Sequence, residues 1–135
     1  MAWLQQNGLM LFMLLMFLML TLRGPILGRY YRVVHISVHD LAARLQKKSS
    51  VVLDVRTAME FETGAIAGVK NVPLSQLKAY AEGMKDKDAD VIVVCRSGAR
   101  SLTGAVVLKR AGFSNVSTVS GGLLHWESQG YPVRR

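Results

Sequence analysis

The sequence has little cysteine and little acidic charge, and the lack of cysteine already excludes two kinds of structure. Its 135 residues include a single cysteine, so an internal disulfide and a cysteine-rich zinc site are both excluded. This length allows one domain with a short extra segment. Half of the residues are hydrophobic, as in globular domains and unlike disordered chains, and we find no internal repeat and no low-complexity stretch.

Nine acidic residues stand against 17 basic ones, and the positions of the charges matter more than the net charge of +8. Arg23, Arg29 and Arg32 lie close together, whereas the other 14 basic residues are spread among the acidic ones without a long basic run. A protein that binds nucleic acid concentrates its positive charge on one stripe or patch. We therefore expect no nucleic-acid partner.

No charged side chain occurs before Arg23, and residues 9–22 are apolar except for Thr21. A bilayer span needs roughly 20 helical residues, and the segment reaches this length when counted from Trp3 to Leu22. A cleaved signal peptide is the alternative, but the segment has neither a basic start nor a small-residue cleavage site. We predict a single uncleaved transmembrane helix in the inner (cytoplasmic) membrane. Because arginines follow it, the C-terminal part should face the cytoplasm.

We accordingly assign residues 1–32 to the anchor and a basic juxtamembrane linker, and residues 33–135 to a soluble domain. In this domain, short β-branched runs alternate with helical patterns, which predicts an α/β fold with a parallel five-stranded sheet flanked by helices. We expect strands at residues 33–36, 51–55, 91–94 and 116–119, a short strand and a turn within 71–75, and helices within 37–45, 57–64, 76–84, 101–111 and 122–129. Residues 91–94 are the most apolar run, as expected of the central strand.

Cys95 follows this apolar run and opens the segment Cys95-Arg96-Ser97-Gly98-Ala99-Arg100-Ser101. Ligands of open parallel sheets bind outside the carboxyl ends of the strands, which is where Cys95 is expected. Small residues at 97–99 allow successive backbone N–H groups to surround an anion, and the N-terminus of the next helix adds positive charge. Together with Arg96 and Arg100, these features favour a thiolate. We predict that Cys95 is a nucleophile and that residues 96–101 bind an anionic substrate; a buried structural cysteine is the alternative.

Three charged residues earlier in the chain are candidate supports for this loop. Asp54 interrupts an apolar strand, where a carboxylate needs a partner, and Arg56 or a backbone amide could supply it. Glu60 is most simply the partner of Thr57 in a capping box, and it could also orient Arg56. The three histidines lie in separate predicted elements, so we expect no histidine base.

The residues from 33 onward resemble the rhodanese (sulfurtransferase) homology domain. The resemblance rests on Leu53-Asp54-Val55-Arg56 with Glu60-Phe61, Gly64, Gly68 and Asn71-Val72-Pro73, on Cys95 to Ser101, and on Gly121-Gly122 with Trp126 and Gly130-Tyr131-Pro132. The family often has His at the position of Ala65 and Pro at that of Ala67. These departures concern local packing, because that histidine is not the nucleophile.

The resemblance implies a rhodanese-like fold and a sulfurtransferase mechanism. Cys95 would take the sulfane sulfur of thiosulfate or a similar small anionic donor, form a persulfide, and pass the sulfur to a thiophilic acceptor. The acceptor would be cyanide in assays and a thiol or a sulfur-carrier protein in cells. The resemblance implies no metal and no organic cofactor.

Other functions are compatible with the same sequence. Dual-specificity phosphatases of the cell-cycle type and some arsenate reductases share the fold, but their loops place five residues between Cys and Arg. Here four residues separate Cys95 from Arg100.

A rhodanese-like module could also bind a partner at the membrane without turnover, or relay sulfur from a membrane protein to cytosolic thiols. The intact Cys95 favours the enzyme.

Overall fold

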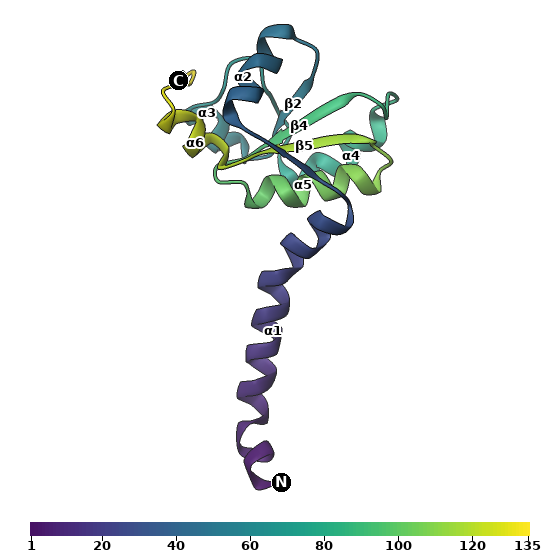
Figure 1. Cartoon of the computed structure of the whole chain (residues 1–135), viewed down its shortest axis with the longest axis vertical. Helices are drawn as coiled ribbons and strands as arrows, with labels where there is room; N and C mark the ends of the chain where they lie inside the picture. The colour runs from purple at the N-terminus through teal and green to yellow at the C-terminus, as the bar shows by residue number, and fades with distance from the viewer.

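The computed structural model describes the backbone of residues 1–135 and all side chains except those of residues 4, 24, 25, 27 and 28. It consists of an α/β domain from which one long helix projects (Figure 1). The elements are, in chain order, α1 (Ala2–Tyr30), β1 (Val34–Ile36), α2 (Val38–Lys47), β2 (Val51–Asp54), α3 (Ala58–Thr63), β3 (Lys70–Asn71), the 3-10 helix η1 (Leu74–Gln76), α4 (Leu77–Gly83), β4 (Asp90–Val94), α5 (Ala99–Arg110), β5 (Asn115–Val119) and α6 (Gly122–Ser128).

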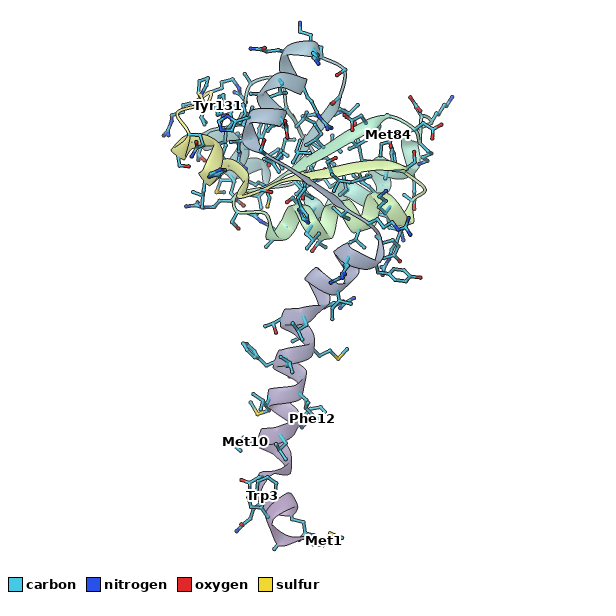
Figure 2. All side chains as sticks on the ribbon, viewed as in Figure 1. Met1, Trp3, Met10, Phe12, Met84 and Tyr131 are labelled. Carbon is cyan, nitrogen blue, oxygen red and sulfur yellow. The ribbon has the colours of Figure 1, made fainter. Side chains whose placement is uncertain are left out.

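The helix α1 contains a 19-residue segment, Gln5–Arg23, with a mean hydropathy of 1.6 and no part buried within the protein. Its apolar side chains point outward on several sides, as Figure 2 shows for Met10 and Phe12. The helix is therefore long and apolar enough to cross a membrane, although a signal sequence at an N-terminus has the same properties.

The helix α1 also extends further than we predicted. We expected the span to end at Leu22 and a linker to follow, but the helix continues to Tyr30. A tertiary contact follows directly: Arg110 of α5 donates from Nε to the Tyr31 hydroxyl at 3.0 Å, and its guanidinium lies 5.4 Å from the ring centre. This contact holds the end of the helix against the domain, and a local sequence pattern does not reveal it.

The sheet has five parallel strands in the order β1-β5-β4-β2-β3, which confirms the predicted fold class. β4 is the central strand, and Val91, Ile92 and Val93 in it are fully buried. Alternate strand residues face opposite sides of a sheet. Accordingly, Val93 packs with residues of α4 and α5, whereas Ile92 packs with residues of α2 and α6. The carboxyl ends of all five strands thus meet at one edge, between two layers of helices.

Side-chain caps begin both α2 and α3, at Ser37 and at Thr57, and the cap at Thr57 agrees with the sequence pattern. The Ser37 hydroxyl accepts the Asp40 N–H at 3.1 Å, and the Thr57 hydroxyl accepts the Glu60 N–H at 3.2 Å. Such caps satisfy backbone donors that the first turn of a helix leaves unpaired. The Thr57 cap fixes the start of α3 immediately after β2, and thereby places Glu60 at the carboxyl edge of the sheet.

The helix after the cysteine begins earlier than predicted, at Ala99 instead of Ser101. Its N-cap is Gly98, whose φ of 114° is a backbone conformation that glycine adopts far more easily than other residues. No side-chain cap marks this start, so the usual sequence signal is missing. As a consequence, Ala99, Arg100 and Ser101 occupy the first turn of α5, and the loop that connects it to β4 is short.

Candidate active site

Cys95 lies directly after β4, at the edge where the strands end. The residue is 1% exposed, and its Sγ accepts a hydrogen bond from the backbone N–H of Gly98 at 3.0 Å. Because Gly98 is the N-cap of α5, the positive end of that helix dipole lies beside the same sulfur. A backbone donor and a helix N-terminus both favour negative charge on the sulfur atom.

The start of α6 supports the cysteine loop from the other side. The Leu123 N–H donates to the Cys95 carbonyl at 2.9 Å, and the Leu124 N–H donates to the Arg96 carbonyl at 3.0 Å. Gly122 approaches so closely that a Cβ added to it would lie 2.5 Å from the Cys95 carbonyl oxygen. The carbonyls of Cys95 and Arg96 are therefore held by α6, while the N–H of Gly98 points to the sulfur.

The residues predicted to bind the substrate differ in exposure. Arg96, Ser97 and Ala99 are exposed, and Gly98 and Arg100 are partly exposed. Ser101 differs from its prediction: its side chain is fully buried, and its hydroxyl donates to the Gly98 carbonyl at 2.9 Å. Its hydroxyl therefore stabilises the turn at the start of α5 and is not offered to a substrate.

Glu60 and Arg100 form a bidentate ion pair that joins α3 to the first turn of α5. Arg100 donates from Nη1 and Nη2 to the two carboxylate oxygens at 2.7 and 2.9 Å. The hydrogen bond from Arg100 lowers the pKa of the Glu60 carboxyl from its ordinary value of 4.5 to about 2. The same bond raises the pKa of Arg100. Glu60 thus orients Arg100, and not the Arg56 side chain that we had considered as its partner.

Asp54 and Arg56 form a second ion pair, which is buried. Arg56 donates from Nη2 to Asp54 at 2.8 Å, and the two side chains are only 5% and 3% exposed. The same guanidinium donates to the Gly64 carbonyl at 2.7 Å and to the Glu60 carbonyl at 3.3 Å. Arg56 is therefore the partner that Asp54 requires, and it also attaches the middle and the C-terminal end of α3 to the end of β2.

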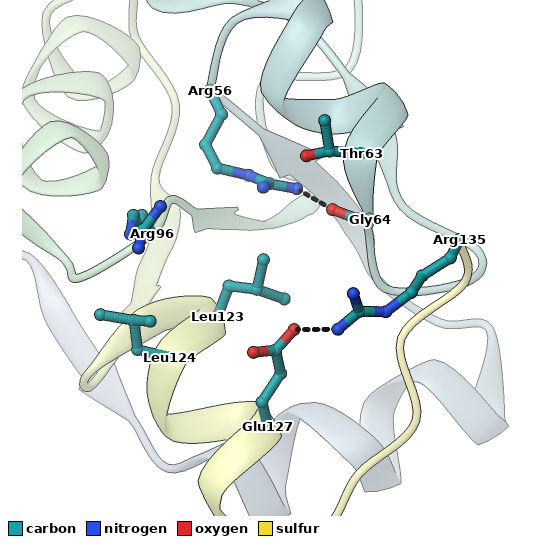
Figure 3. A pocket seen from close by; sticks show the side chains of 8 residues that line it. All are labelled: Arg56, Thr63, Gly64, Arg96, Leu123, Leu124, Glu127 and Arg135. Atoms are coloured by element: carbon teal, nitrogen blue, oxygen red, sulfur yellow. Dashed lines mark hydrogen bonds and ion pairs between the residues drawn. The ribbon is translucent and has the colours of Figure 1, made fainter.

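A cavity of about 310 Å³ lies beside the cysteine loop, lined by Arg56, Thr63, Gly64, Arg96, Leu123, Leu124, Glu127 and Arg135 (Figure 3). Within the part of the chain that the structure describes, the Arg96 guanidinium forms no hydrogen bond or ion pair with protein groups. It therefore differs from Arg56 and Arg100, each of which is held by a carboxylate. The sequence did not indicate the cavity, because α3, α6 and the C-terminal residues all contribute to it.

Ala65, which stands where the family pattern often has histidine, lies where the C-terminal segment packs on the domain. Ala65 is fully buried, and its backbone exchanges hydrogen bonds of 2.9 and 2.7 Å with Arg134. Ala65 therefore lies where backbone hydrogen bonds hold the C-terminal segment on the domain.

Comparisons with known proteins agree with the predicted fold. The family model of the rhodanese-like domain matches residues 37–129. A sulfurtransferase of Allochromatium vinosum is 32% identical over 99 residues, covering 73% of this chain and 92% of that protein. The thiosulfate sulfurtransferase GlpE of Shewanella oneidensis is 34% identical over 92 residues, covering 68% and 90%. The crystal structure of a rhodanese-related protein from Thermoplasma volcanium matches with a TM-score of 0.67 at 34% identity, covering 75% and 97%.

Proposed function

The chain belongs to the rhodanese-like domain family, and from this premise we propose that it is a thiosulfate sulfurtransferase of the rhodanese type, with Cys95 as the sulfur carrier. The observation that carries the proposal is the hydrogen bond of 3.0 Å from the Gly98 N–H to Cys95 Sγ at the start of α5. A sulfur that must be an anion before and after it reacts is best placed where a backbone donor and a helix dipole stabilise negative charge.

In the first half of the reaction, the Cys95 thiolate attacks the sulfane sulfur of thiosulfate. A bond forms between Sγ and that sulfur, the S–S bond of the donor breaks, and its electron pair leaves with sulfite. The Cys95 persulfide anion retains the one negative charge that the thiolate had. Loop amides at residues 96–100 would bind the donor anion, and Arg96 would attract it, since its charge is not already neutralised by a carboxylate.

In the second half, an acceptor removes the outer sulfur of the persulfide. A thiol attacks that sulfur, the bond to Sγ breaks, and its electron pair returns to Sγ. The proton of the thiol is left to Cys95 or to water, and the acceptor leaves as a persulfide. No external oxidant or reductant is consumed. A thiol or a sulfur-carrier protein would serve in cells, and cyanide would serve in an assay.

We assign positioning roles to Asp54, Arg56 and Glu60. Asp54 and Arg56 would hold α3 at the end of β2, and Glu60 would hold Arg100 at the first turn of α5. Arg100 therefore contributes loop rigidity rather than charge, because Glu60 neutralises its guanidinium and leaves it fewer donors for a substrate.

For the N-terminal part, we propose that α1 is an uncleaved anchor that spans the inner membrane once, with the domain in the cytoplasm and the boundary after residue 32. Support comes from the unburied apolar segment Gln5–Arg23 and from the arginines at and after its end. An anchored protein should stay in the membrane pellet after alkaline carbonate extraction and keep its initial residues. A mature protein that begins after residue 23 would show that the segment is a signal peptide.

Turnover tests the catalytic proposal directly. The full chain in mild detergent should convert thiosulfate and cyanide to thiocyanate and sulfite, and Cys95→Ser should abolish this conversion. Neither protein should hydrolyse an aryl phosphate. Phosphate release that depends on Cys95, without thiocyanate formation, would favour the phosphatase alternative. Absence of both activities would favour a non-catalytic binding module.

A further inference from the structure

The link between α1 and the α/β domain is short and is held by contacts. Only three residues separate the end of α1 at Tyr30 from the start of β1 at Val34. Within this link, the Tyr31 hydroxyl accepts the hydrogen bond from Arg110 of α5, and Val33 packs against buried residues of the domain. A linker this short, with its side chains packed on the domain, leaves little freedom of orientation. The direction of α1 therefore determines which side of the domain faces a membrane that α1 spans.

The side of the domain nearest to α1 is formed by α5. Figure 1 shows α5 lying across the end of α1. Thr103 and Arg110 are both exposed, and their separation of seven residues is about two helical turns, so they share one face of α5. Arg110 on this face contacts Tyr31, just after the end of α1. The outer face of α5, which carries Thr103 and Arg110, therefore points toward the membrane.

The charges of this side have one sign. The first acidic residue of the chain is Asp40, and none occurs between Asp90 and Glu127, so neither α1 nor α5 contains a carboxylate side chain. The neighbouring helix α4 and the loop after it, residues 77–89, contain three lysines, one glutamate and two aspartates, which offset one another. An excess of positive charge therefore remains where α1 meets α5.

Three exposed arginines, which we call the junction arginines, carry this excess: Arg29, Arg32 and Arg110. Within the described part of the chain, none of them forms an ion pair with a carboxylate. Arg110 donates to the uncharged Tyr31 hydroxyl, so its charge is not neutralised. The junction arginines are therefore available to an anionic partner.

The length of α1 places the junction arginines at the lipid headgroups. The apolar segment ends at Arg23, and α1 continues for seven residues to Tyr30, which is about 10 Å at 1.5 Å per residue. A bilayer is about 40–45 Å thick with its headgroups and about 30 Å without them, so each headgroup layer is about 5–8 Å deep. Arg29 and Arg32 would then lie at its outer boundary, where screening acts over about 8–10 Å. Headgroup phosphates are within that range.

We propose that the junction arginines bind the headgroups of anionic phospholipids and thereby hold the outer face of α5 against the membrane surface. The proposal rests on the membrane anchor proposed above and goes beyond it, because it fixes the orientation of the domain. Guanidinium groups suit this role, since each can donate two parallel hydrogen bonds to one phosphate. The helix α5 has 12 residues and is about 18 Å long, and its far end carries the cysteine loop. Cys95 is therefore held beside the membrane surface.

The test measures how close the outer face of α5 comes to the headgroups. A fluorophore is attached to Thr103→Cys in the Cys95→Ser protein, which has no other cysteine. A second sample carries the fluorophore at Gln46→Cys, an exposed position of α2 in the opposite helix layer. The full chain is placed in nanodiscs that contain a lipid with a nitroxide quencher on its headgroup. The nanodiscs are made either of phosphatidylcholine or of an equal mixture of phosphatidylcholine and phosphatidylglycerol.

We expect stronger quenching at position 103 than at position 46, and a further increase at position 103 in the anionic nanodiscs. Because the contact is electrostatic, this increase should disappear in about 1 M salt, where the Debye length is about 3 Å. Position 46 should respond to neither change.

Two substitutions that are matched in charge and in backbone conformation test the arginines themselves. Arg32 and Lys48 are both exposed and have positive φ angles of 55° and 53°. Lys48 follows α2, away from α5. Arg32→Gln should lower the ratio of docked to undocked domains by about fivefold, the effect of one basic residue at an anionic surface. Arg29→Gln should act in the same direction, and Lys48→Gln should leave the ratio unchanged.

The contrary results are distinct from one another. Equal quenching at position 103 in neutral and anionic nanodiscs would show that the link alone orients the domain, and would overturn the proposal. Equal losses in Arg32→Gln and Lys48→Gln would overturn it as well. A chain that fails to enter nanodiscs would contradict the anchor, and this proposal with it. Because every sample carries Cys95→Ser, none of these results depends on sulfur transfer.

Discussion

Gly122 provides the sharpest test of how α6 holds the cysteine loop. A Cβ at this position would lie 2.5 Å from the Cys95 carbonyl oxygen and 2.7 Å from that of Arg96. Cβ atoms essentially never come closer than 3.0 Å to other heavy atoms, so in Gly122→Ala the loop must retreat by about 0.5 Å or more. The φ of 57° adds about 1 kcal/mol for any residue with a side chain.

Displacing the loop should affect chemistry more than stability. A displacement of about 1 Å at a reacting group can reduce a rate by roughly 100-fold, so we expect a 10- to 100-fold slower formation of the persulfide in Gly122→Ala. The rate is measured by quenching samples during reaction with thiosulfate and determining their intact mass. Thermal unfolding of the same samples gives the loss of stability.

Gly130→Ala is the matched control for backbone strain. Gly130 has a φ of 82°, but a Cβ there would meet no atom within 4 Å. This variant should lose a similar amount of stability from strain and keep the normal rate of persulfide formation. If Gly122→Ala also reacts at the normal rate, α6 does not position the loop and our reasoning about this contact is wrong.

Two further predictions concern the ion pairs. Asp54→Asn should destabilise the domain by about 3–5 kcal/mol in urea unfolding, because it leaves the buried Arg56 guanidinium without its counter-charge. A loss below about 1 kcal/mol would show that the Asp54–Arg56 pair does not hold α3 on β2. Glu60→Gln should cost only about 1 kcal/mol at neutral pH, since the Glu60 and Arg100 side chains are 32% and 37% exposed. Because folding lowers the pKa of Glu60 from 4.5 to about 2, its contribution is complete above pH 4.5 and is lost as the pH falls toward 2. The difference in unfolding free energy between the parent protein and Glu60→Gln should therefore shrink over that range. A constant difference would show that the ion pair with Arg100 does not stabilise the fold.

The order of the elements and the place of Cys95 could be predicted because both depend on local patterns. Residues 91–94 are apolar without alternation, as expected for a strand buried on both faces, and the structure places them in the centre of the sheet. A cysteine that follows such a strand has to lie at its carboxyl end. Sequence alone therefore located the candidate nucleophile.

The contacts that complete the site could not be predicted, because they join segments far apart in the chain. Glu60 and Arg100 are 40 residues apart, and the capping pattern at Thr57 already offered a local explanation for Glu60. The early start of α5 escaped prediction because Gly98 caps the helix through its backbone conformation alone. The hydrogen bonds from Leu123 and Leu124 to the loop depend on how α6 packs, which no local pattern indicates.

Intact mass spectrometry can show whether Cys95 carries sulfur. The full chain in mild detergent is incubated with thiosulfate, desalted and weighed, and Cys95→Ser is treated in parallel. We predict that the parent protein gains the mass of one sulfur atom, that cyanide removes it as thiocyanate, and that the variant gains nothing. A parent protein without the added sulfur, or a variant that gains it equally, would contradict the account.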